Sequence, residues 1–310
     1  MAKCIVFGGT GFIGKHLVIH LLGEGHEVTV FTRPSGEERQ LVTHPRLKYY
    51  FGDFFNTHDV NEAIINKEYV FHLISLTNPA VSEEDPYIDL DTNVRMSIHL
   101  LEACVNNNVK RVIYTSSGGS IYGEGNNTIL SEGDPTYPIS PYAIGKQTVE
   151  GYLRYFHKKH NLDYIVYRIS NVYGEGQNTA NNRHGVISVF LKNILADKNL
   201  TIFGDGTMTR DYIEVRDLTK FMARVFNSSS KYNLYNIGSG KGVTVNEILT
   251  TIELVTQKNA LTVHEPSPSS YVKDIVLDCT RVVNEFGSIA ITPLEEGIRM
   301  MYEEYLVGEK

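Results

Sequence analysis

The stretch Gly8-Gly9-Thr10-Gly11-Phe12-Ile13-Gly14 decides the fold predicted for this chain, because of what stands on either side of it. It follows the apolar run Cys4–Phe7, which is typical of a strand, and it opens Lys15–Leu22, whose pattern is typical of a helix. A glycine-rich turn in this context lets the backbone approach a pyrophosphate, and the helix N-terminus supplies N–H donors. We therefore predict a dinucleotide phosphate site that uses Gly8, Gly11, Phe12, Ile13 and Gly14.

Strand-like runs alternate with helical patterns through the first half of the chain. After the first strand, β-branched and aromatic runs occur at Val28–Thr32, Lys48–Phe51, Val70–Ile74, Arg111–Thr115 and Tyr164–Ile169. Helical patterns such as Val94–Cys104 lie between them, and strands separated by helices pair in parallel through right-handed crossovers. The pattern predicts an α/β fold: a Rossmann-type doubly wound parallel sheet with a smaller C-terminal α/β substrate lobe.

The character of the sequence changes after about residue 170. We expect residues 1–170 to form the dinucleotide-binding domain, with strand and helix segments returning to it from about 211–240. Residues 171–310 are expected to form mainly the substrate-binding lobe. Within the second half, the pattern predicts a helix at Val186–Leu195, a strand at Leu234–Ile237 and a final helix from Pro293 to Leu306.

Composition excludes several classes of protein. The 310 residues carry a net charge of −7, so the chain lacks the basic surplus that binding to nucleic acid requires. It has no apolar stretch long enough to span a membrane and no targeting peptide, so we expect a cytoplasmic protein. Its three cysteines, Cys4, Cys104 and Cys279, have no paired spacing, so neither a disulfide framework nor a metal site is expected.

The end of the second predicted strand bears on the type of cofactor. An acidic residue there would hydrogen-bond the ribose 2′-hydroxyl of NAD, but this stretch ends in Thr32-Arg33. Arg33 can pair with the 2′-phosphate of NADP or be a solvated surface arginine, so NAD and NADP both stay open. Asp53, in Gly52-Asp53-Phe54 after the third strand, is either an adenine contact or a helix cap. Further cofactor contacts are expected at Phe54, Leu73, Ser75 and Ser116.

Tyr142 and Lys146 stand four positions apart, so on a helix both side chains project from one face. A phenol is a poor base at neutral pH, and a neighbouring ammonium favours the phenolate. A second pair, Tyr155 and Lys159, has the same spacing. Because Ser140-Pro141 starts the helix at the carboxyl edge of the sheet, where doubly wound folds bind ligands, we predict that the first pair is catalytic and the second lies on the surface.

A hydroxyl-rich stretch, Tyr114–Ser120, follows the fifth predicted strand and reaches the same carboxyl edge. A serine hydroxyl there can hydrogen-bond a substrate hydroxyl or carbonyl while the tyrosine moves its proton. With these pieces in place, the ordered motifs of nearly the whole chain resemble the extended short-chain dehydrogenase/reductase superfamily, specifically the NAD-dependent nucleotide-sugar epimerase/dehydratase family. The motifs are Gly8–Gly14, Asp91–Val94, Ser116-Ser117, Tyr122-Gly123, Ser140–Lys146, Arg168–Gly174, Phe203–Gly206, Arg210–Tyr212 and Tyr235–Gly238.

The resemblance implies sugar C4 redox chemistry through a 4-keto intermediate. It implies that Tyr142 is the acid/base, and that Lys146 tunes it and holds the nicotinamide ribose. It also implies a homodimer through the Tyr87–Cys104 and Tyr142–His157 helices. Contacts to a nucleotide-sugar substrate, with UDP as the expected nucleotide, are implied at Asn171, Val186, Phe203, Arg210, Tyr212 and Asp274. A guanidinium fork such as that of Arg210 is a natural clamp for a diphosphate.

Departures from the family pattern reduce the number of reactions that the sequence allows. Family dehydratases and decarboxylases need acids ahead of Tyr122-Gly123, where this chain has Gly118, Gly119 and Ser120, so 4-epimerases and 4-keto reductases remain. Ser117, 25 residues before Tyr142, is our choice for the family serine, with Ser120 next. Near Asp274 the family often has a second diphosphate arginine, and this chain offers Tyr271 and Lys273.

We therefore expect an NAD(P)-dependent nucleotide-sugar 4-epimerase of the UDP-glucose 4-epimerase type. The alternative is an NADPH-dependent reductase of a nucleotide 4-keto sugar, which Arg33 favours. A non-catalytic nucleotide sensor is a third hypothesis, which the presence of both Tyr142 and Lys146 disfavours.

Overall fold

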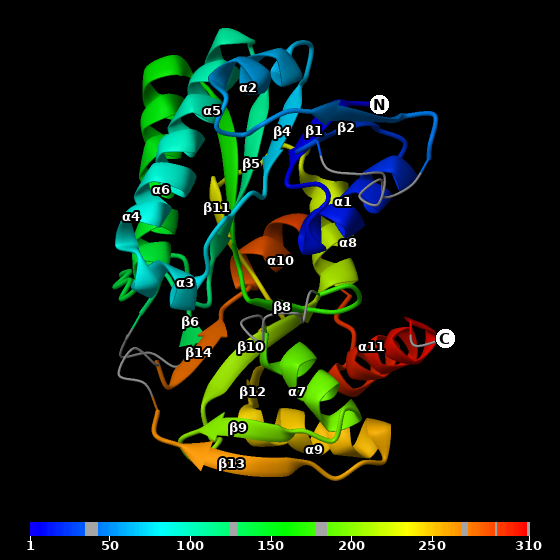
Figure 1. Ribbon diagram of the computed structural model, residues 1–310. Coiled ribbons are helices and arrows are strands. Elements are labelled where there is room, and N and C mark those ends of the chain that lie inside the picture. Colours follow the sequence, from blue (N-terminus) through cyan, green and yellow to red (C-terminus); the bar gives the residue numbers. More distant parts are fainter. Residues whose placement is uncertain (35–42, 124–128, 178–184, 268–271, 289, 309–310) are drawn as a thin grey trace. The chain divides into compact units, whose positions relative to one another are not determined.

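A computed structural model of the chain shows two compact units (Figure 1). The structure describes residues 1–34, 43–123, 129–177, 185–267, 272–288 and 290–308. The first unit contains Met1–Ile121, Pro138–Arg168 and Thr219–Tyr235. The second contains Tyr122–Tyr137, Ile169–Leu218 and Asn236–Lys310. Each unit is thus assembled from segments that lie far apart in the sequence.

A seven-stranded sheet forms the centre of the first unit. Its neighbouring strands pair in parallel from β3 to β5, and the central strand β1 lies between β2 and β4. The chain therefore reverses its direction of winding at β1, as the predicted doubly wound Rossmann-type fold requires, and this prediction is confirmed. In spatial order the strands are β3 (Leu47–Phe51), β2 (Glu27–Thr32), β1 (Lys3–Phe7), β4 (Tyr69–His72), β5 (Arg111–Ser117), β7 (Asp163–Ile169) and β11 (Leu234–Ile237).

Helices cover this sheet and bury its apolar side chains. One core cluster joins Ile64, Leu100 and Leu153 from three helices to Val70 and Val112 of the strands. Burial of each such side chain contributes about 1.5–3 kcal/mol to folding. The helices that lie wholly or partly in this unit are α1 (Phe12–Gly23), α2 (Thr57–Ile64), α3 (Pro79–Glu84), α4 (Pro86–Ile88), the π-helical turn η2 (Asp89–Val94), α5 (Arg95–Asn106), α6 (Pro141–His160) and α8 (Val215–Val225).

The second unit has smaller sheets and its own core. Four strands run in the order β12 (Gly242–Thr244), β10 (Thr209–Glu214), β14 (Asp274–Leu277) and β6 (Ile129–Leu130), and β8 (Asn171–Tyr173) also pairs with β10. A separate pair is formed by β9 (Asn199–Phe203) and β13 (Leu261–Glu265). The helices are α7 (Val186–Leu195), α9 (Val245–Thr256), α10 (Thr280–Phe286) and α11 (Leu294–Gly308).

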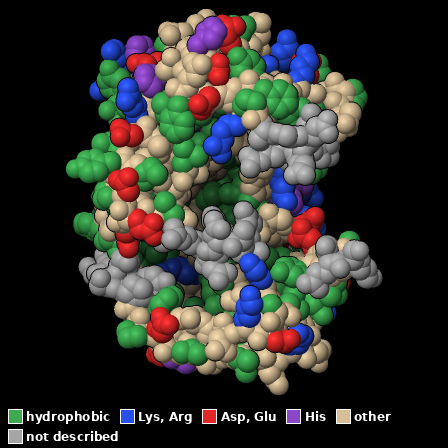
Figure 2. All heavy atoms as spheres, viewed as in Figure 1, with side chains coloured by type: hydrophobic (Ala, Val, Ile, Leu, Met, Phe, Trp, Pro, Cys, Tyr) green, Lys and Arg blue, Asp and Glu red, His purple; other side chains and the backbone are tan. Residues whose placement is uncertain are grey.

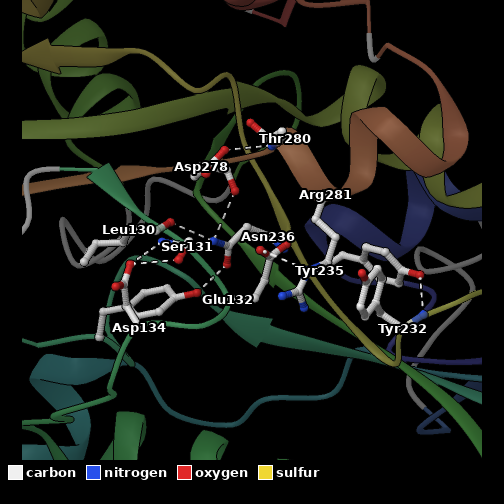
Figure 3. A network of polar contacts seen from close by, with 11 residues as sticks. Leu130, Ser131, Glu132, Asp134, Tyr232, Tyr235, Asn236, Asp278, Thr280 and Arg281 are labelled. Atoms are coloured by element: carbon white, nitrogen blue, oxygen red, sulfur yellow. Dashed lines mark hydrogen bonds and ion pairs between the residues drawn. The ribbon is translucent and has the colours of Figure 1, made fainter.

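A buried polar network in the second unit explains two of the motifs found in the sequence (Figure 3). The Asn236 amide donates to the carbonyl oxygens of Leu130 and Asp278, at 2.8 and 3.3 Å, and its backbone N–H donates to Glu132. The hydroxyl of the fully buried Tyr122 donates to the Asn236 side-chain oxygen at 2.6 Å. Tyr122-Gly123 and Tyr235–Gly238 therefore include side chains that hold the second unit together.

The surface carries charges of both signs. On the face seen in Figure 2, acidic and basic side chains are interspersed among apolar and uncharged polar ones, in keeping with the net charge of −7. None of the helices in the described part of the chain is both long and apolar enough to cross a membrane. The described residues also contain no cluster of His, Cys, Asp and Glu that could hold a metal ion.

Candidate active site

The turn between β1 and α1 has the geometry that a phosphate needs. Residue Gly11 precedes the helix and has no side chain to cap it, so the N–H groups of Phe12 and Ile13 in the first turn are left for an anionic ligand. A Cβ atom at Gly14 would lie 2.0 Å from the carbonyl oxygen of Gly8, so only glycine permits this approach of helix to strand. The residues present therefore fit a dinucleotide phosphate.

Other predicted cofactor residues follow the carboxyl ends of neighbouring strands. Thr32, at the end of β2, is buried, and its hydroxyl lies 3.4 Å from that of Thr10, whereas Arg33 is exposed. After β4, the Leu73 N–H donates to Phe7 in β1, and Ser75 is exposed. Because these strands are parallel, their carboxyl ends share one edge of the sheet, as predicted for a ligand site.

Three further predicted cofactor residues differ in what surrounds them. The Asp53 carboxylate accepts from the Phe55 N–H at 3.0 Å, while Asn56 caps α2, so Asp53 is not the cap of that helix. Phe54 is buried in the apolar core. The Ser116 hydroxyl is buried and has no hydrogen-bond partner among the residues that the structure describes. A buried hydroxyl of this kind is suited to a ligand atom, since an unpaired polar group is costly.

The start of α6 fixes the position of Tyr142. The Ser140 side chain caps the helix by accepting from the Ala143 N–H, and Pro141 occupies the first turn. The Tyr142 N–H donates to the buried Ser82 hydroxyl at 3.1 Å. The backbone of Tyr142 is therefore held both by its own helix and by α3.

The predicted catalytic pair lies beside the end of β5. The Lys146 ammonium is buried, donates to the Thr115 carbonyl oxygen at 3.0 Å and lies 5.7 Å from the centre of the Tyr142 ring. The Ser117 side chain hydrogen-bonds the Tyr142 hydroxyl. Tyr142, Lys146 and Ser117 are thus brought together, whereas Ser120 lies in the turn after β5 and is partly exposed.

The pKa values in this cluster are set mainly by burial. Burial raises the pKa of Tyr142 to about 12, and the hydrogen bond from Ser117 opposes this rise. Burial lowers the pKa of Lys146 to about 8, although Asp89 and Glu150 favour the charged amine. In the protein alone, the hydrogen bond from Ser117 is a contact that favours the phenolate. The tuning of Tyr142 by Lys146 stays a prediction.

The second Tyr-Lys pair lies on the surface, as predicted. The Lys159 ammonium donates to the Tyr155 hydroxyl at 2.8 Å, and both side chains are exposed. The helix rises about 1.5 Å per residue, so Tyr155 lies about 20 Å further along α6 than Tyr142. The two pairs thus differ in their distance from the carboxyl edge of the sheet.

A serine substitution tests which hydroxyl supports Tyr142. We expect Ser117→Ala to lower turnover by about 10-fold or more, because it removes the hydrogen bond that favours the phenolate. Ser120→Ala is the matched control and should stay within about 3-fold of the wild type. The measurement is the rate of nucleotide-sugar interconversion, and a larger loss in Ser120→Ala would reverse the assignment.

The predicted substrate residues lie in the second unit. Asn171 in β8 faces Tyr212 in the register of β8 with β10, and its side chain hydrogen-bonds the Tyr212 hydroxyl. Asp274 begins β14 and pairs in register with Thr209, next to Arg210. Val186 begins α7, and Phe203 ends β9. Tyr271, considered as a further phosphate contact, lies outside the described residues, and Lys273 precedes β14.

The sequence Arg210-Asp211-Tyr212 places alternate side chains on opposite faces of β10. The Arg210 guanidinium donates to the carbonyl oxygens of Val272 and Lys273, at 2.6 and 3.0 Å, which fixes its plane. The buried Asp211 carboxylate accepts from the N–H and hydroxyl of Ser239, both at 2.8 Å. Asp211 thus anchors β10 while Arg210 and Tyr212 share the other face.

Comparison with known proteins places this chain in a family. The model described as the NAD dependent epimerase/dehydratase family matches residues 4–238. The chain belongs to this family. It is 32% identical over 297 residues to a putative UDP-glucose 4-epimerase of Methanocaldococcus jannaschii, covering 95% of both chains. It is also 29% identical over 304 residues to a dTDP-4-dehydro-6-deoxyglucose reductase of Escherichia coli, covering 95% and 94%.

Solved structures agree with this placement. A UDP-glucose 4-epimerase of Thermotoga maritima, solved with UDP-glucose, has a TM-score of 0.92 and 31% identity, with 99% of both chains covered. A UDP-glucose 4-epimerase of Thermus thermophilus, solved with NAD, has a TM-score of 0.89 and 28% identity, with 98% of both covered. The predicted family and fold are confirmed, and among the two reactions left open the epimerase is supported over the reductase.

Sequence reasoning missed several residues that support the site. Ser82 holds the Tyr142 backbone, Asp211 anchors β10, and Asp89 is a buried carboxylate that acts on both Tyr142 and Lys146. Ser82 and Asp89 are distant from their partners in the sequence, so no local spacing marks them. Asp211 sits inside a quoted motif, and its alternation with Arg210 and Tyr212 was a usable signal.

Proposed function

We propose that this protein is an NAD-dependent UDP-sugar 4-epimerase. The observation that carries the proposal is the cluster of Tyr142, Ser117 and Lys146 at the same sheet edge as a glycine cradle that fits a dinucleotide. The family is NAD-dependent, and relatives and solved neighbours named as UDP-glucose 4-epimerases support the reaction and the UDP-linked substrate.

The cofactor residues have separate tasks in this proposal. When bound, NAD would supply the reversible hydride acceptor that oxidation and reduction at C4 of the sugar require. The first turn of α1 binds the pyrophosphate through its N–H groups, and Gly14 allows that turn to approach β1. Thr32 and Asp53 contact the adenosine half, while Arg33 is exposed and solvated. Leu73, Ser75 and Ser116 line the carboxyl edge of the sheet toward the nicotinamide.

Tyr142 moves the proton of the sugar hydroxyl. Its phenol takes the C4 hydroxyl proton as the 4-keto sugar forms and returns it when the other face is reduced. Ser117 donates to the phenol oxygen and so lowers the cost of the phenolate. Lys146, fixed by the Thr115 carbonyl, presents an ammonium to the nicotinamide ribose. The ammonium also stabilises the negative charge that develops on the tyrosine.

The second unit holds the nucleotide of the substrate. Arg210 clamps the diphosphate, because a fixed guanidinium plane matches two phosphate oxygens. Asn171 and Tyr212 form a hydrogen-bonded pair beside it. Val186, Phe203 and Asp274 complete the proposed contacts to the nucleotide.

A homodimer is part of the proposal. Tyr87 on α4, Leu90 on η2 and Ile144 on α6 are large apolar side chains that are exposed in the single chain. They lie on the helices through which the family resemblance implies dimerisation, and η2 packs against α6. Burial of such side chains favours association. A cytoplasmic location stays a prediction.

The experiment is incubation of the purified protein with UDP-glucose, UDP-galactose and their N-acetyl forms, with catalytic NAD and, separately, with no added cofactor. We expect interconversion of epimers without accumulation of reduced nicotinamide, because the hydride returns in every cycle. A 4-keto-sugar reductase would instead consume NADPH in proportion to product. Failure to interconvert any nucleotide sugar would contradict the proposal.

A further inference from the structure

A buried carboxylate stands directly against the helix that carries the catalytic pair. Asp89, the first residue of η2, is 2% exposed. A Cβ atom at Gly145 would lie 2.3 Å from its Oδ2 atom, so the carboxylate is in contact with the α6 backbone. Gly145 immediately precedes Lys146, and the absence of a side chain there allows this approach.

The two oxygens of Asp89 have different surroundings. Oδ1 accepts from the Thr77 hydroxyl and from the Asn93 amide, and that amide also donates to the Thr77 oxygen at 2.8 Å. Oδ2, on the side of α6, has no hydrogen-bond partner among the residues that the structure describes. Burial of a carboxylate that lacks a full set of hydrogen-bond donors destabilises the folded state. A purely structural role therefore does not explain why Asp89 is buried here.

The charges around this carboxylate identify what it acts on. Asp89 favours the charged form of Lys146 and disfavours the phenolates of Tyr142 and Tyr114. Burial lowers the pKa of His72 to about 3, so this ring is neutral. Several other charged side chains on η2 and on the helices beside it are exposed to solvent, among them Glu83, Glu84, Asp85, Asp91, Arg95, Glu102 and Arg154.

Glu150 is the other acid that acts on Lys146, and it already has a partner. Its carboxylate accepts two hydrogen bonds from the buried Arg168 guanidinium, at 2.8 and 3.1 Å. An ion pair of this kind presents little net charge to its neighbours. Asp89, whose Oδ2 lacks a donor among the described residues, is therefore the acid whose field on the Lys146 ammonium is least compensated.

We propose that Asp89 is a positioning residue whose buried carboxylate keeps Lys146 in its charged ammonium form within the site. The inference rests on the proposed function, in which the charged Lys146 contacts the nicotinamide ribose and the tyrosine at neutral pH. Burial by itself favours the neutral amine in this place. The attraction between the carboxylate and the buried ammonium thus offsets the free-energy cost of burying Asp89.

Asp89→Asn removes the charge and keeps the shape of the side chain. The asparagine oxygen can accept from Thr77 and Asn93 as Oδ1 does, and its NH2 group then takes the place of Oδ2. Asp91→Asn is the matched control, because Asp91 lies on the same turn and is exposed. Lys146→Met and the Asp89→Asn/Lys146→Met double variant complete the set.

The first readout is the free energy of unfolding of the full chain without added nucleotide, measured in urea from pH 6 to 10.5. The folded-state pKa of Lys146, about 8, lies below the ordinary value of 10.5, so the unfolded chain binds more protons in between and stability rises with pH across that window. Asp89→Asn should start this rise about one pH unit lower. The shift should vanish in the Lys146→Met background.

The second readout is the pH profile of epimerisation. Activity that requires the ammonium should fall at an alkaline limb, and Asp89→Asn should move this limb about one pH unit lower, with Asp91→Asn unchanged. An unmoved stability curve, a shift that persists without Lys146, or failure of Asp89→Asn to fold while Asp91→Asn folds would overturn the proposal. A wild-type protein that epimerises no nucleotide sugar would contradict the proposed function. The stability curves would still test whether Asp89 keeps Lys146 charged, because they do not depend on activity.

Discussion

Tyr142→Phe is expected to lower the turnover number for nucleotide-sugar interconversion by at least about 100-fold. The change keeps the ring and removes only the hydroxyl that Ser117 contacts, so the loss reports the general acid/base. Binding of NAD and of the UDP-sugar should change little, because the backbone of Tyr142 remains held by Ser82. Initial rates under saturating substrate provide the measurement, and isothermal titration checks binding.

Tyr155→Phe is the control within the same helix. It removes a hydroxyl that accepts a hydrogen bond from a lysine four residues later, on an exposed face. Turnover should stay within about 2-fold of the wild type, because this pair lies far from the carboxyl edge of the sheet. If the two variants lost activity to the same extent, the choice of Tyr142 would be wrong.

Gly14→Ala is expected to abolish measurable NAD binding and to destabilise the fold by about 1–3 kcal/mol. The added Cβ would stand 2.0 Å from the Gly8 carbonyl oxygen and 2.7 Å from the Gly9 Cα atom, which are backbone atoms. Helix α1 must therefore move away from β1, and its N–H groups leave their positions. Fluorescence titration with NAD and thermal unfolding give the two measurements.

Gly23→Ala is the matched control on the same helix. A Cβ atom there would meet nothing within 4 Å among the described residues, so the substitution should change stability by less than about 1 kcal/mol and leave NAD affinity unaltered. Wild-type affinity in Gly14→Ala would show that the cradle does not bind the cofactor as we propose.

Local features of the chain were predictable from the sequence. The strand and helix patterns reproduce β11 and α7 with their bounds, Leu234–Ile237 and Val186–Leu195, because each has a clear apolar period and clear ends. The glycine turn before α1 and the placement of Tyr142 and Lys146 on one helix were predictable for the same reason. Such signals depend only on residues that are close together in the sequence.

Long-range features were not predictable in the same way. Ser117 could be chosen over Ser120 only by a count of residues, whereas its hydrogen bond to Tyr142 depends on how β5 meets α6. The effect of burial on Tyr142 and Lys146 likewise depends on the packed surroundings. Asp89 owes its role to contacts with Thr77 and Gly145, which no local pattern connects to it.

The fate of the hydrogen on C4 of the sugar tests the central claim most directly. UDP-glucose that carries deuterium at C4 should be converted, in ordinary water, to an epimer that keeps the deuterium at C4, because the hydride passes to the cofactor and returns to the opposite face of the same sugar. Tyr142 exchanges only the hydroxyl proton. Mass and NMR spectra of the product should show full retention, and replacement of the deuterium by solvent hydrogen would contradict the account.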